Sequence, residues 1–455
     1  MEKRNNKIGQ PLVLVSFTIV FLFVLSFINL PKNLSDSHWF SQKQVDVFSE
    51  FRKDKPKPIL VSLLIVKKDT PVFFKNTQPP EDETLITDYG TDSSYSLNLF
   101  YQKLDSAKQN HLKIRIAYFG DSFIEGDDIT DEIRLRLQSL FGGTGIGFVP
   151  VQSAVSSLYT QIKLNGTGWT DYHFRDNPNK YPLGLSGHLF YSTNSAAVDF
   201  IPKFKTPTTD VKLYYGKMPA NVVLNVVKNG KGEVVKTLGN NLINETIISS
   251  TSAVNSLSLN TSNENLPIYG VSFEDKEGVY LDNYSFRGNT SILTQQITNE
   301  VMQQMNNYLH YDLIIVHYGI NAVEHEKQEF SWFESSMHKV IQNMKKGFGK
   351  VPILIVSTSD IGYKYDGKYS TEHGVPYMVA TQKEIAKRHK VAFWNLYQSM
   401  GGENTITNWV EGDTVLANKD YTHVNSKGAK RVGDLFFNKL MLSKAYYQRT
   451  KLTKK

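Results

Sequence analysis

The chain has no cysteine among its 455 residues. This absence excludes disulfide bonds, a cysteine-ligated metal site and lipid attachment to an N-terminal cysteine. Histidine is also scarce: only 11 are present, and they form neither an HExxH motif nor a cluster with aspartate. The sequence therefore predicts that the protein uses no metal and no other cofactor.

The chain also lacks the signs of a nucleic-acid-binding protein. Its formal net charge is +7, and much of the excess lies at the two ends, in Lys3, Arg4, Lys7, Lys451, Lys454 and Lys455. No basic helix and no aromatic RNA-binding motif accompanies these charges. We therefore expect no nucleic-acid partner.

A long apolar run near the N-terminus predicts where the protein resides. Pro11 to Leu30 carry no charged residue over 20 positions, which is long enough to cross the hydrocarbon core of a bilayer. Basic residues precede the run and favour a cytoplasmic N-terminus. No small-residue cleavage site follows, so residues 1–31 are predicted to be a cytoplasmic tip and an uncleaved transmembrane signal anchor, with a cleaved signal peptide as the alternative. In both cases the rest of the chain lies outside the cytoplasm, in the periplasm or at the cell surface.

The next segment, residues 32–108, is predicted to be a linker and N-terminal extension. It is polar and contains prolines, with one apolar run at 59–66 that is too short to span a membrane and suits a strand or a short buried helix. Tyr95 to Leu104 is expected to be a helix that packs on the following domain. At the far end, residues 446–455 form a basic tail.

Two stretches, 109–156 and 279–445, predict one α/β domain. Short apolar runs alternate there with helical periodicity, which is typical of a doubly wound parallel sheet with helices on both faces. The expected strands are 114–118, 313–316, 353–356 and 391–394, and the expected helices are 128–140, 291–309, 333–345, 376–389 and 426–442. In such a sheet, sites lie at the C-terminal ends of the strands.

Residues 157–278, between these stretches, lack helical periodicity. They contain short β-rich runs separated by turns, such as 197–201, 211–215 and 222–227. This pattern predicts an inserted antiparallel β-sandwich. Trp169 and Tyr172 lie in the insert, and exposed rings there could stack on sugars. The alternative is that they are core or turn aromatics.

Three short motifs, far apart in the chain, carry side chains suited to ester chemistry. Ser122 follows the first expected strand in Gly120-Asp121-Ser122, where we expect the strand to turn directly into a helix whose N–H groups face an anion. Asn321 follows the strand at 313–316. Asp420 and His423 lie three residues apart, before the last helix.

These residue types correspond to the parts of a serine esterase. A serine hydroxyl is a weak nucleophile until a base accepts its proton, which is the role expected of His423. Asp420 would hold the imidazole in one tautomer. The backbone N–H of Ser122 and the side-chain amide of Asn321 would then donate to the oxyanion that forms when the serine attacks.

On these motifs the chain resembles the SGNH, or GDSL, hydrolase superfamily. The resemblance implies that Ser122, Asp420 and His423 are the catalytic residues, in a flavodoxin-like three-layer fold. It also implies a glycine N–H in the oxyanion hole, and the best match, in the stretch 284–289, is Gly288. The hole would then consist of Ser122, Gly288 and Asn321. The motif around Asn321 usually ends in aspartate, but Ala322 stands there.

A longer stretch, residues 126–150 with its glycine-rich second half, resembles the bacterial peptidoglycan O-acetylesterase branch of that superfamily. In that branch a β-sandwich similar to a carbohydrate-binding module is inserted before the second motif. The resemblance therefore implies glycan binding by residues 157–278, with Trp169 and Tyr172 as candidate substrate-binding residues.

The sequence thus predicts an exported, membrane-anchored serine carbohydrate esterase. It would remove O-acetyl groups from peptidoglycan or another envelope polysaccharide through an acetyl-enzyme. Its partners would be an O-acetylated glycan and, through the N-terminal helix, the membrane. Two alternatives stay open: a polysaccharide O-acetyltransferase with the same triad, and a non-catalytic glycan-binding scaffold.

Overall fold

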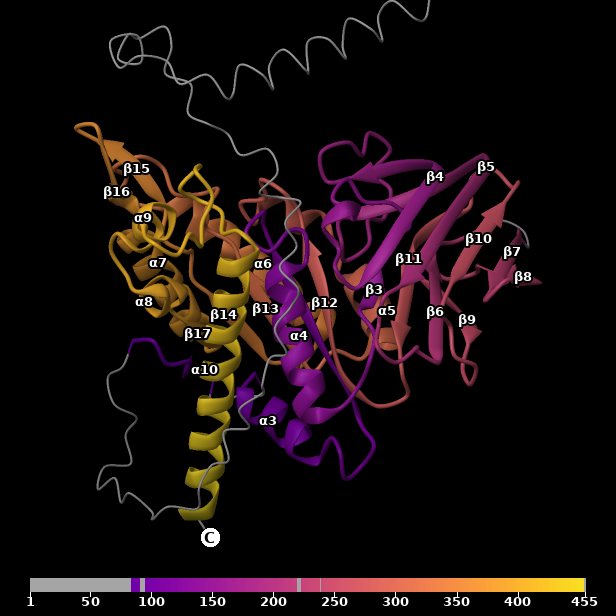
Figure 1. The fold of residues 1–455 in the computed structure, drawn as a ribbon, viewed down its shortest axis with the longest axis horizontal. Coiled ribbons are helices and arrows are strands. Elements are labelled where there is room, and N and C mark those ends of the chain that lie inside the picture. The colour runs from indigo at the N-terminus through magenta and orange to yellow at the C-terminus, as the bar shows by residue number, and fades with distance from the viewer. Residues whose placement is uncertain (1–82, 91–94, 219–221, 238, 454–455) are drawn as a thin grey trace, which may run out of the picture. The chain divides into compact units, whose positions relative to one another are not determined.

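The computed structural model describes residues 83–90, 95–218, 222–237 and 239–453, which all belong to one compact unit, Lys75–Lys455 (Figure 1). Within these ranges, no helix is both long enough and apolar enough to cross a membrane. The predicted span at Pro11 to Leu30, the tip before it and most of residues 32–108 lie outside the described residues.

A six-stranded, mostly parallel sheet forms the centre of the unit. In spatial order its strands are β1 (Thr87–Asp88), β17 (Ala392–Trp394), β14 (Ile353–Val356), β13 (Leu313–His317), β2 (Lys113–Gly120) and β12 (Gly278–Ser285). The neighbours from β17 to β12 are parallel, and β1 is antiparallel to β17. Numbered along the chain, the parallel strands run 2-1-3-4-5, which is the flavodoxin-like doubly wound order. This order confirms the predicted α/β fold class.

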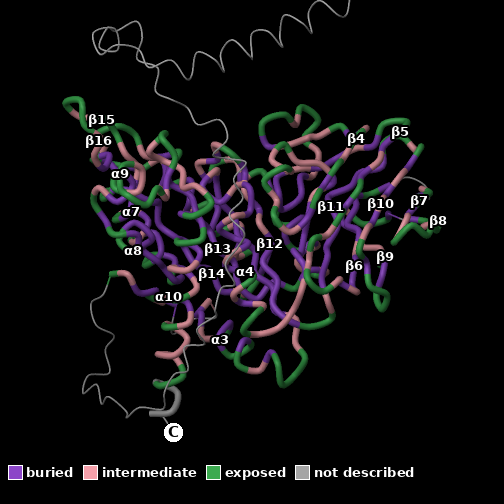
Figure 2. The backbone as a smooth tube through the Cα atoms, viewed as in Figure 1, coloured by how far each residue is buried: buried purple, intermediate pink, exposed green. Residues whose placement is uncertain are grey.

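Helices cover both faces of this sheet, so the fold has three layers. Successive side chains of a strand point to opposite faces, and accordingly Ala117 and Phe119 of β2 enter one core while Ile116 and Tyr118 enter the other. The first core includes residues of α5, α6 and α7, and the second includes residues of α3, α4 and α10. The helices are α3 (Leu97–Ser106), α4 (Asp128–Phe141), α5 (Asn299–Leu309), α6 (Ser331–Phe348), α7 (Gly374–His389), α8 (Leu396–Met400), α9 (Thr405–Glu411) and α10 (Ser426–Thr453). Figure 2 shows the central strands as buried over most of their length.

Three helical predictions need correction. The expected helix at 291–309 is a 3-10 turn (Ile292–Gln296) followed by α5, because the Thr298 side chain accepts a hydrogen bond from Val301 N and caps a new helix. Helix α10 continues to Thr453 and includes most of the predicted basic tail. Helix α4 begins at Asp128 as predicted, but the loop 121–127 separates it from Ser122. Ser122 therefore does not lie at a helix N-terminus, because the positive φ angles of Gly126 (88°) and Asp127 (72°) delay the start of the helix.

The inserted region, together with the short strand β3 that precedes it, forms a second sheet, in which every pair of strands is antiparallel. Its strands are β3 (Gly147–Val149), β4 (Ile162–His173), β5 (His188–Pro202), β6 (Asp210–Tyr215), β7 (Val222–Lys228), β8 (Lys231–Thr237), β9 (Asn244–Ser249), β10 (Leu257–Thr261) and β11 (Pro267–Glu274). They enclose a third apolar core of their own, which includes Phe200, Leu213 and Val226. The predicted antiparallel β character of the insert is therefore correct. A small hairpin, β15 (Gly362–Tyr365) and β16 (Lys368–Thr371), projects beyond the parallel sheet (Figure 1).

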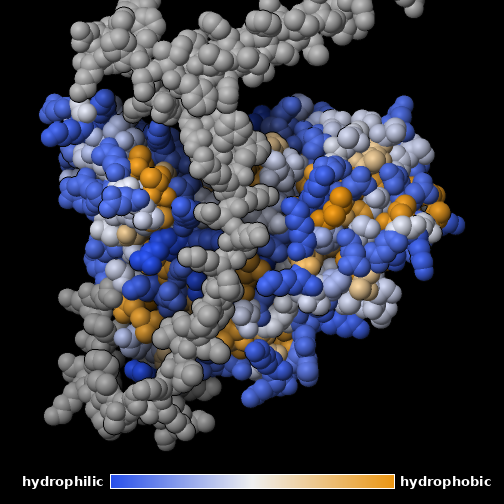
Figure 3. Space-filling model, in the orientation of Figure 1, coloured by the Kyte–Doolittle hydropathy of each residue, from blue (hydrophilic) through white to orange (hydrophobic). Residues whose placement is uncertain are grey.

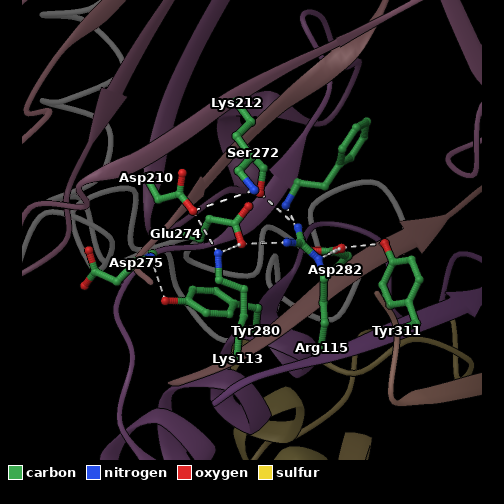
Figure 4. Close-up of polar contacts among 12 residues, drawn as sticks. Lys113, Arg115, Asp210, Lys212, Ser272, Glu274, Asp275, Tyr280, Asp282 and Tyr311 are labelled. Carbon is green, nitrogen blue, oxygen red and sulfur yellow. Dashed lines mark hydrogen bonds and ion pairs between the residues drawn. The ribbon is translucent and has the colours of Figure 1, made fainter. Parts of the chain in front are cut away.

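A buried ion network joins the two sheets (Figure 4). The Arg115 guanidinium of β2 donates to Asp282 of β12 at 2.7 Å and to Glu274 of β11 at 2.8 Å, and all three side chains are at most 1% exposed. Lys113 also pairs with Glu274, at 2.8 Å. Tyr311 OH donates to Asp282 Oδ2 at 2.6 Å. Arg115 and Asp282 belong to the parallel sheet and Glu274 belongs to the second sheet, so all three charges are paired only when the two sheets pack together. Separation of the sheets would leave buried charges without partners.

The visible face of the described part is mainly hydrophilic, with hydrophobic residues in small separate patches (Figure 3). Val234 and Ile247 of the second sheet are the most exposed of the large apolar side chains, at 61% and 57%. Scattered apolar residues of this kind are normal on a protein surface and do not by themselves indicate a partner.

Candidate active site

Ser122, His423 and Asp420 form a hydrogen-bonded series across the imidazole ring. His423 Nε2 lies 2.9 Å from Ser122 Oγ, although 301 positions separate the two residues. On the other side of the ring, His423 Nδ1 lies 2.8 Å from Asp420 Oδ2. The fold therefore brings together the serine, the histidine and the aspartate that the sequence singled out. With the proton on Nδ1, Nε2 is free to accept the proton of the Ser122 hydroxyl.

Close packing at the end of β2 sets the position of Ser122. A Cβ on Gly120 would lie 2.9 Å from the backbone oxygen of His317 on β13, so only glycine lets the two strands approach this closely. The next residue, Asp121, is 1% exposed and accepts a hydrogen bond from Phe123 N at 3.0 Å. The chain turns sharply there and leaves Ser122 partly exposed at the C-terminal edge of the sheet.

A tight turn holds the Asp420–His423 pair. Asp420 Oδ1 accepts hydrogen bonds from the backbone N–H groups of Thr422 and His423, both at 3.0 Å. Partial burial raises the pKa of Asp420, but the donors of His423 and Thr422 outweigh this effect, and the net pKa lies below the usual value. The carboxylate therefore stays ionised near neutral pH, which favours the imidazolium that forms when His423 takes a proton.

The proposed oxyanion donors follow three adjacent strands. Ser122 follows β2, Gly288 follows β12 and Asn321 follows β13, and β2 lies between the other two in a parallel arrangement. All three residues consequently lie at one edge, where the strand order reverses direction. In the described part of the chain, neither Ser122 N–H nor Gly288 N–H donates to an acceptor, which leaves both free for a ligand.

Asp121 is a residue of the site that the sequence analysis missed. Burial raises the pKa of Asp121 to about 7. Hydrogen bonds from Phe123 N and from the Asn321 side chain lower this pKa, but the effect of burial is larger. The Asn321 side chain therefore lies near the Asp121 carboxyl, which accepts a hydrogen bond from Phe123 N of the nucleophile loop. Its position beside Ser122 in the sequence was visible, but its burial and its contact with a residue 200 positions away were not.

Comparison with known proteins identifies the fold of this chain. No family model matches the chain, and no curated protein matches it either. Among solved structures, a peptidoglycan O-acetylesterase is similar over 79% of this chain and 99% of its own, with a TM-score of 0.65 and 22% sequence identity. The chain has the fold of that esterase. This likeness confirms, at the level of the fold, the resemblance predicted from the motifs.

Two further solved structures match a smaller part of this chain and have lower TM-scores. An acetyl xylan esterase matches 35% of this chain and 80% of its own, with a TM-score of 0.28 and 19% identity. A family two carbohydrate esterase from Clostridium thermocellum matches 61% of this chain and 100% of its own, with a TM-score of 0.26 and 8% identity.

The expectation of an exposed indole at Trp169 is wrong. Trp169 is 7% exposed, belongs to the core of the second sheet, and donates from Nε1 to Ala197 O at 2.9 Å. A ring held in this way cannot present its face to a sugar. Tyr172 is half-buried and packs on Tyr181 and Tyr191, with ring centroids 4.6 and 5.6 Å away. In the described ranges no group of three or more histidine, aspartate or glutamate side chains is arranged to hold a metal ion.

Proposed function

We propose that the protein is a serine carbohydrate esterase that removes O-acetyl groups from peptidoglycan or another envelope polysaccharide. The observation that supports this most is the hydrogen-bonded series Ser122 Oγ, His423 Nε2, His423 Nδ1 and Asp420 Oδ2, with spacings of 2.9 and 2.8 Å. A solved protein with the same fold is a peptidoglycan O-acetylesterase, which suggests the class of substrate.

In the proposed first half-reaction, Ser122 Oγ attacks the acetyl carbonyl carbon while His423 Nε2 takes the hydroxyl proton. The carbonyl oxygen becomes an oxyanion, which receives hydrogen bonds from Ser122 N–H, Gly288 N–H and the Asn321 amide. When the intermediate collapses, the bond to the sugar oxygen breaks, and His423 returns the proton to that oxygen. The products are the free sugar hydroxyl and an acetyl group on Ser122.

In the second half-reaction, water attacks the acetyl-enzyme. His423 accepts a proton from the water and then gives it to Ser122 Oγ as the ester bond breaks, so acetate leaves and the enzyme is restored. Asp420 stabilises the imidazolium in both halves. We also propose that residues 1–31 anchor the chain in the membrane and that the catalytic part faces outward, on the basis of the uncharged run from Pro11 to Leu30.

Turnover of a chromogenic ester by the purified full chain tests the proposal. The wild type should hydrolyse 4-nitrophenyl acetate, and Ser122→Ala should abolish turnover without loss of folded protein. Ser335→Ala, at an exposed position on α6, is the matched control and should keep full activity. Full activity of Ser122→Ala would contradict the mechanism.

Acetylated peptidoglycan as substrate then distinguishes the alternatives. Release of free acetate supports the esterase. Transfer of the acetyl group to an added glycan, with little free acetate, would instead indicate an O-acetyltransferase. Failure of the wild type to form any acetyl-enzyme would indicate the non-catalytic scaffold.

A further inference from the structure

The loop that follows β12 is held by a segment of the second sheet. This loop, residues 286–289, contains Gly288, and its start is fixed by Phe286 N, which donates to Gly120 O at 3.1 Å. The segment that contacts it, residues 173–188, joins β4 to β5. The inference below rests on the proposed function, in which Gly288 N–H is an oxyanion donor.

Aromatic rings from that segment surround Phe286, which is 8% exposed. The ring centroids of Phe174, His188 and His173 lie 5.0, 5.4 and 5.9 Å from that of Phe286. In addition, Gln296 Nε2 donates to Phe174 O at 2.9 Å and ties the segment to the parallel-sheet domain. The base of the loop is therefore packed between the two sheets and is not an independent surface turn.

Arg175 contacts the loop beyond this packing. Its Nη2 donates to the backbone oxygen of Arg287 at 2.8 Å, and its guanidinium carbon lies 5.6 Å from the centroid of the Phe286 ring. Gly288 has a φ of 69°, and a Cβ there would collide with Arg175 Nη2, so the guanidinium rests against this glycine.

The acceptor of this hydrogen bond belongs to the same peptide group as the proposed oxyanion donor. Arg287 C=O and Gly288 N–H are the two ends of one planar, trans unit, so an anchor on the oxygen fixes the direction of the N–H. A cation on the carbonyl end also polarises the peptide and strengthens the N–H as a donor. The direction of Gly288 N–H thus depends on a residue of the segment that joins β4 to β5.

We propose that Arg175 is a positioning residue for the acetyl-transfer chemistry: it orients and polarises the 287–288 peptide group whose N–H receives the oxyanion. The Arg287 side chain also holds the loop, because its Nε donates to Glu125 Oε2 at 2.7 Å and so ties the loop to the one that carries Ser122. The inserted sheet is consequently a part of the catalytic apparatus, in addition to any contact that it makes with glycan.

Steady-state kinetics of Arg175→Ala on 4-nitrophenyl acetate tests this proposal. Removal of one oxyanion donor typically costs about 10²–10³ in kcat, and a misdirected donor should cost less, so we expect kcat to fall about 10- to 100-fold with little change in KM. Arg175→Lys keeps the charge and a donor and should lie between Arg175→Ala and the wild type. The inhibition constant of methylboronic acid, which forms a tetrahedral adduct on a catalytic serine, should rise in parallel with the loss in kcat/KM.

Arg388→Ala is the matched control, because Arg388 is also an exposed arginine (62%) and its partner Glu334 lies on α6. This variant should match the wild type, and the melting temperature of Arg175→Ala should stay close to that of Arg388→Ala. If the wild type is active and the kcat of Arg175→Ala lies within twofold of it, the positioning role of Arg175 is overturned while the proposed function stands. A wild type without esterase activity would overturn the proposed function, and the positioning role with it.

Discussion

The ring of Tyr421 lies flat against the ring of Tyr369, with centroids 3.5 Å apart and planes inclined by 8°. Tyr421 lies between Asp420 and His423, and its backbone is in the left-handed region with a φ of 54°. For a residue with a bulky side chain this conformation costs on the order of 1–3 kcal/mol and persists only where the surroundings impose it. Here the surroundings include the stack, a hydrogen bond from Tyr421 OH to Glu411 Oε1 at 2.7 Å, and one from Gly362 N to Tyr421 O at 2.7 Å.

Tyr369→Ala should therefore lower the rate of the chemical step. Without the stack, the turn that aligns His423 with Ser122 loses a main support, and a displacement of about 1 Å in a catalytic group can cost roughly 10²-fold in rate. We expect kcat for 4-nitrophenyl acetate to fall about 10-fold or more, with a small change in KM. Tyr363→Ala is the control, because Tyr363 lies on the same hairpin and is 43% exposed. Equal kcat values for the two variants would show that the stack does not support the site.

Asn321→Ala should lower kcat by roughly 10²–10³ with a smaller change in KM, because the hydrogen bond from the amide strengthens only as charge develops on the oxyanion. The measurement is the separate determination of kcat and KM on the same ester. An increase confined to KM would mean that Asn321 binds the substrate without stabilising the oxyanion.

Arg115→Ala should destabilise the fold by about 3–5 kcal/mol, because it leaves the buried carboxylates of Glu274 and Asp282 without their main partner. The free energy of unfolding from urea denaturation measures this loss. Arg388→Ala is the control: Arg388 is 62% exposed and pairs with Glu334 at the surface, so its loss should cost about 1 kcal/mol or less. Equal decreases in the free energy of unfolding for both variants would show that the buried ion network does not stabilise the fold more than a surface ion pair does.

Asp121 should make the fold less stable as the pH rises from about 4 to 7. Its folded pKa of about 7 lies above the ordinary pKa of an aspartate, so in this window the native state holds a proton that the unfolded chain releases. The protonated carboxyl stabilises the fold fully below the pKa that Asp121 has in the unfolded chain. This stabilisation, up to about 4 kcal/mol in the free energy of unfolding, is lost as the pH rises through the pKa that Asp121 has in the folded protein. Asp121→Asn cannot titrate and should lack this contribution.

Urea denaturation of wild type and Asp121→Asn at about pH 4.5 and 7.5, near the two ends of this window, isolates the effect, because other titrating groups cancel in the difference. The unfolding free energy of wild type minus that of the variant should be lower at the higher pH. A difference that is the same at both pH values would show that the Asp121 carboxyl is not held protonated by burial.

Much of the parallel-sheet domain follows from local patterns in the sequence. Apolar runs such as 313–316 and 353–356 are strands because their length and composition suit a buried parallel sheet, whatever the rest of the chain does. One strand of this sheet, β12, was nevertheless not predicted. Its Asp282 and Asn283 are unfavourable in strands, and Asp282 is accommodated only because Arg115 and Tyr311 reach it from elsewhere.

The sequence by itself determined the order of the motifs around Ser122, Asn321, Asp420 and His423 along the α/β pattern, because motif order and spacing are properties of the chain. Only the tertiary structure decided which distant groups meet. Three features depend on residues from separate elements: the burial of Trp169, the contact of Arg175 with the Arg287 carbonyl, and the stack of Tyr369 on Tyr421. Such contacts depend on how the two sheets and the hairpin pack together, and no local propensity encodes that packing.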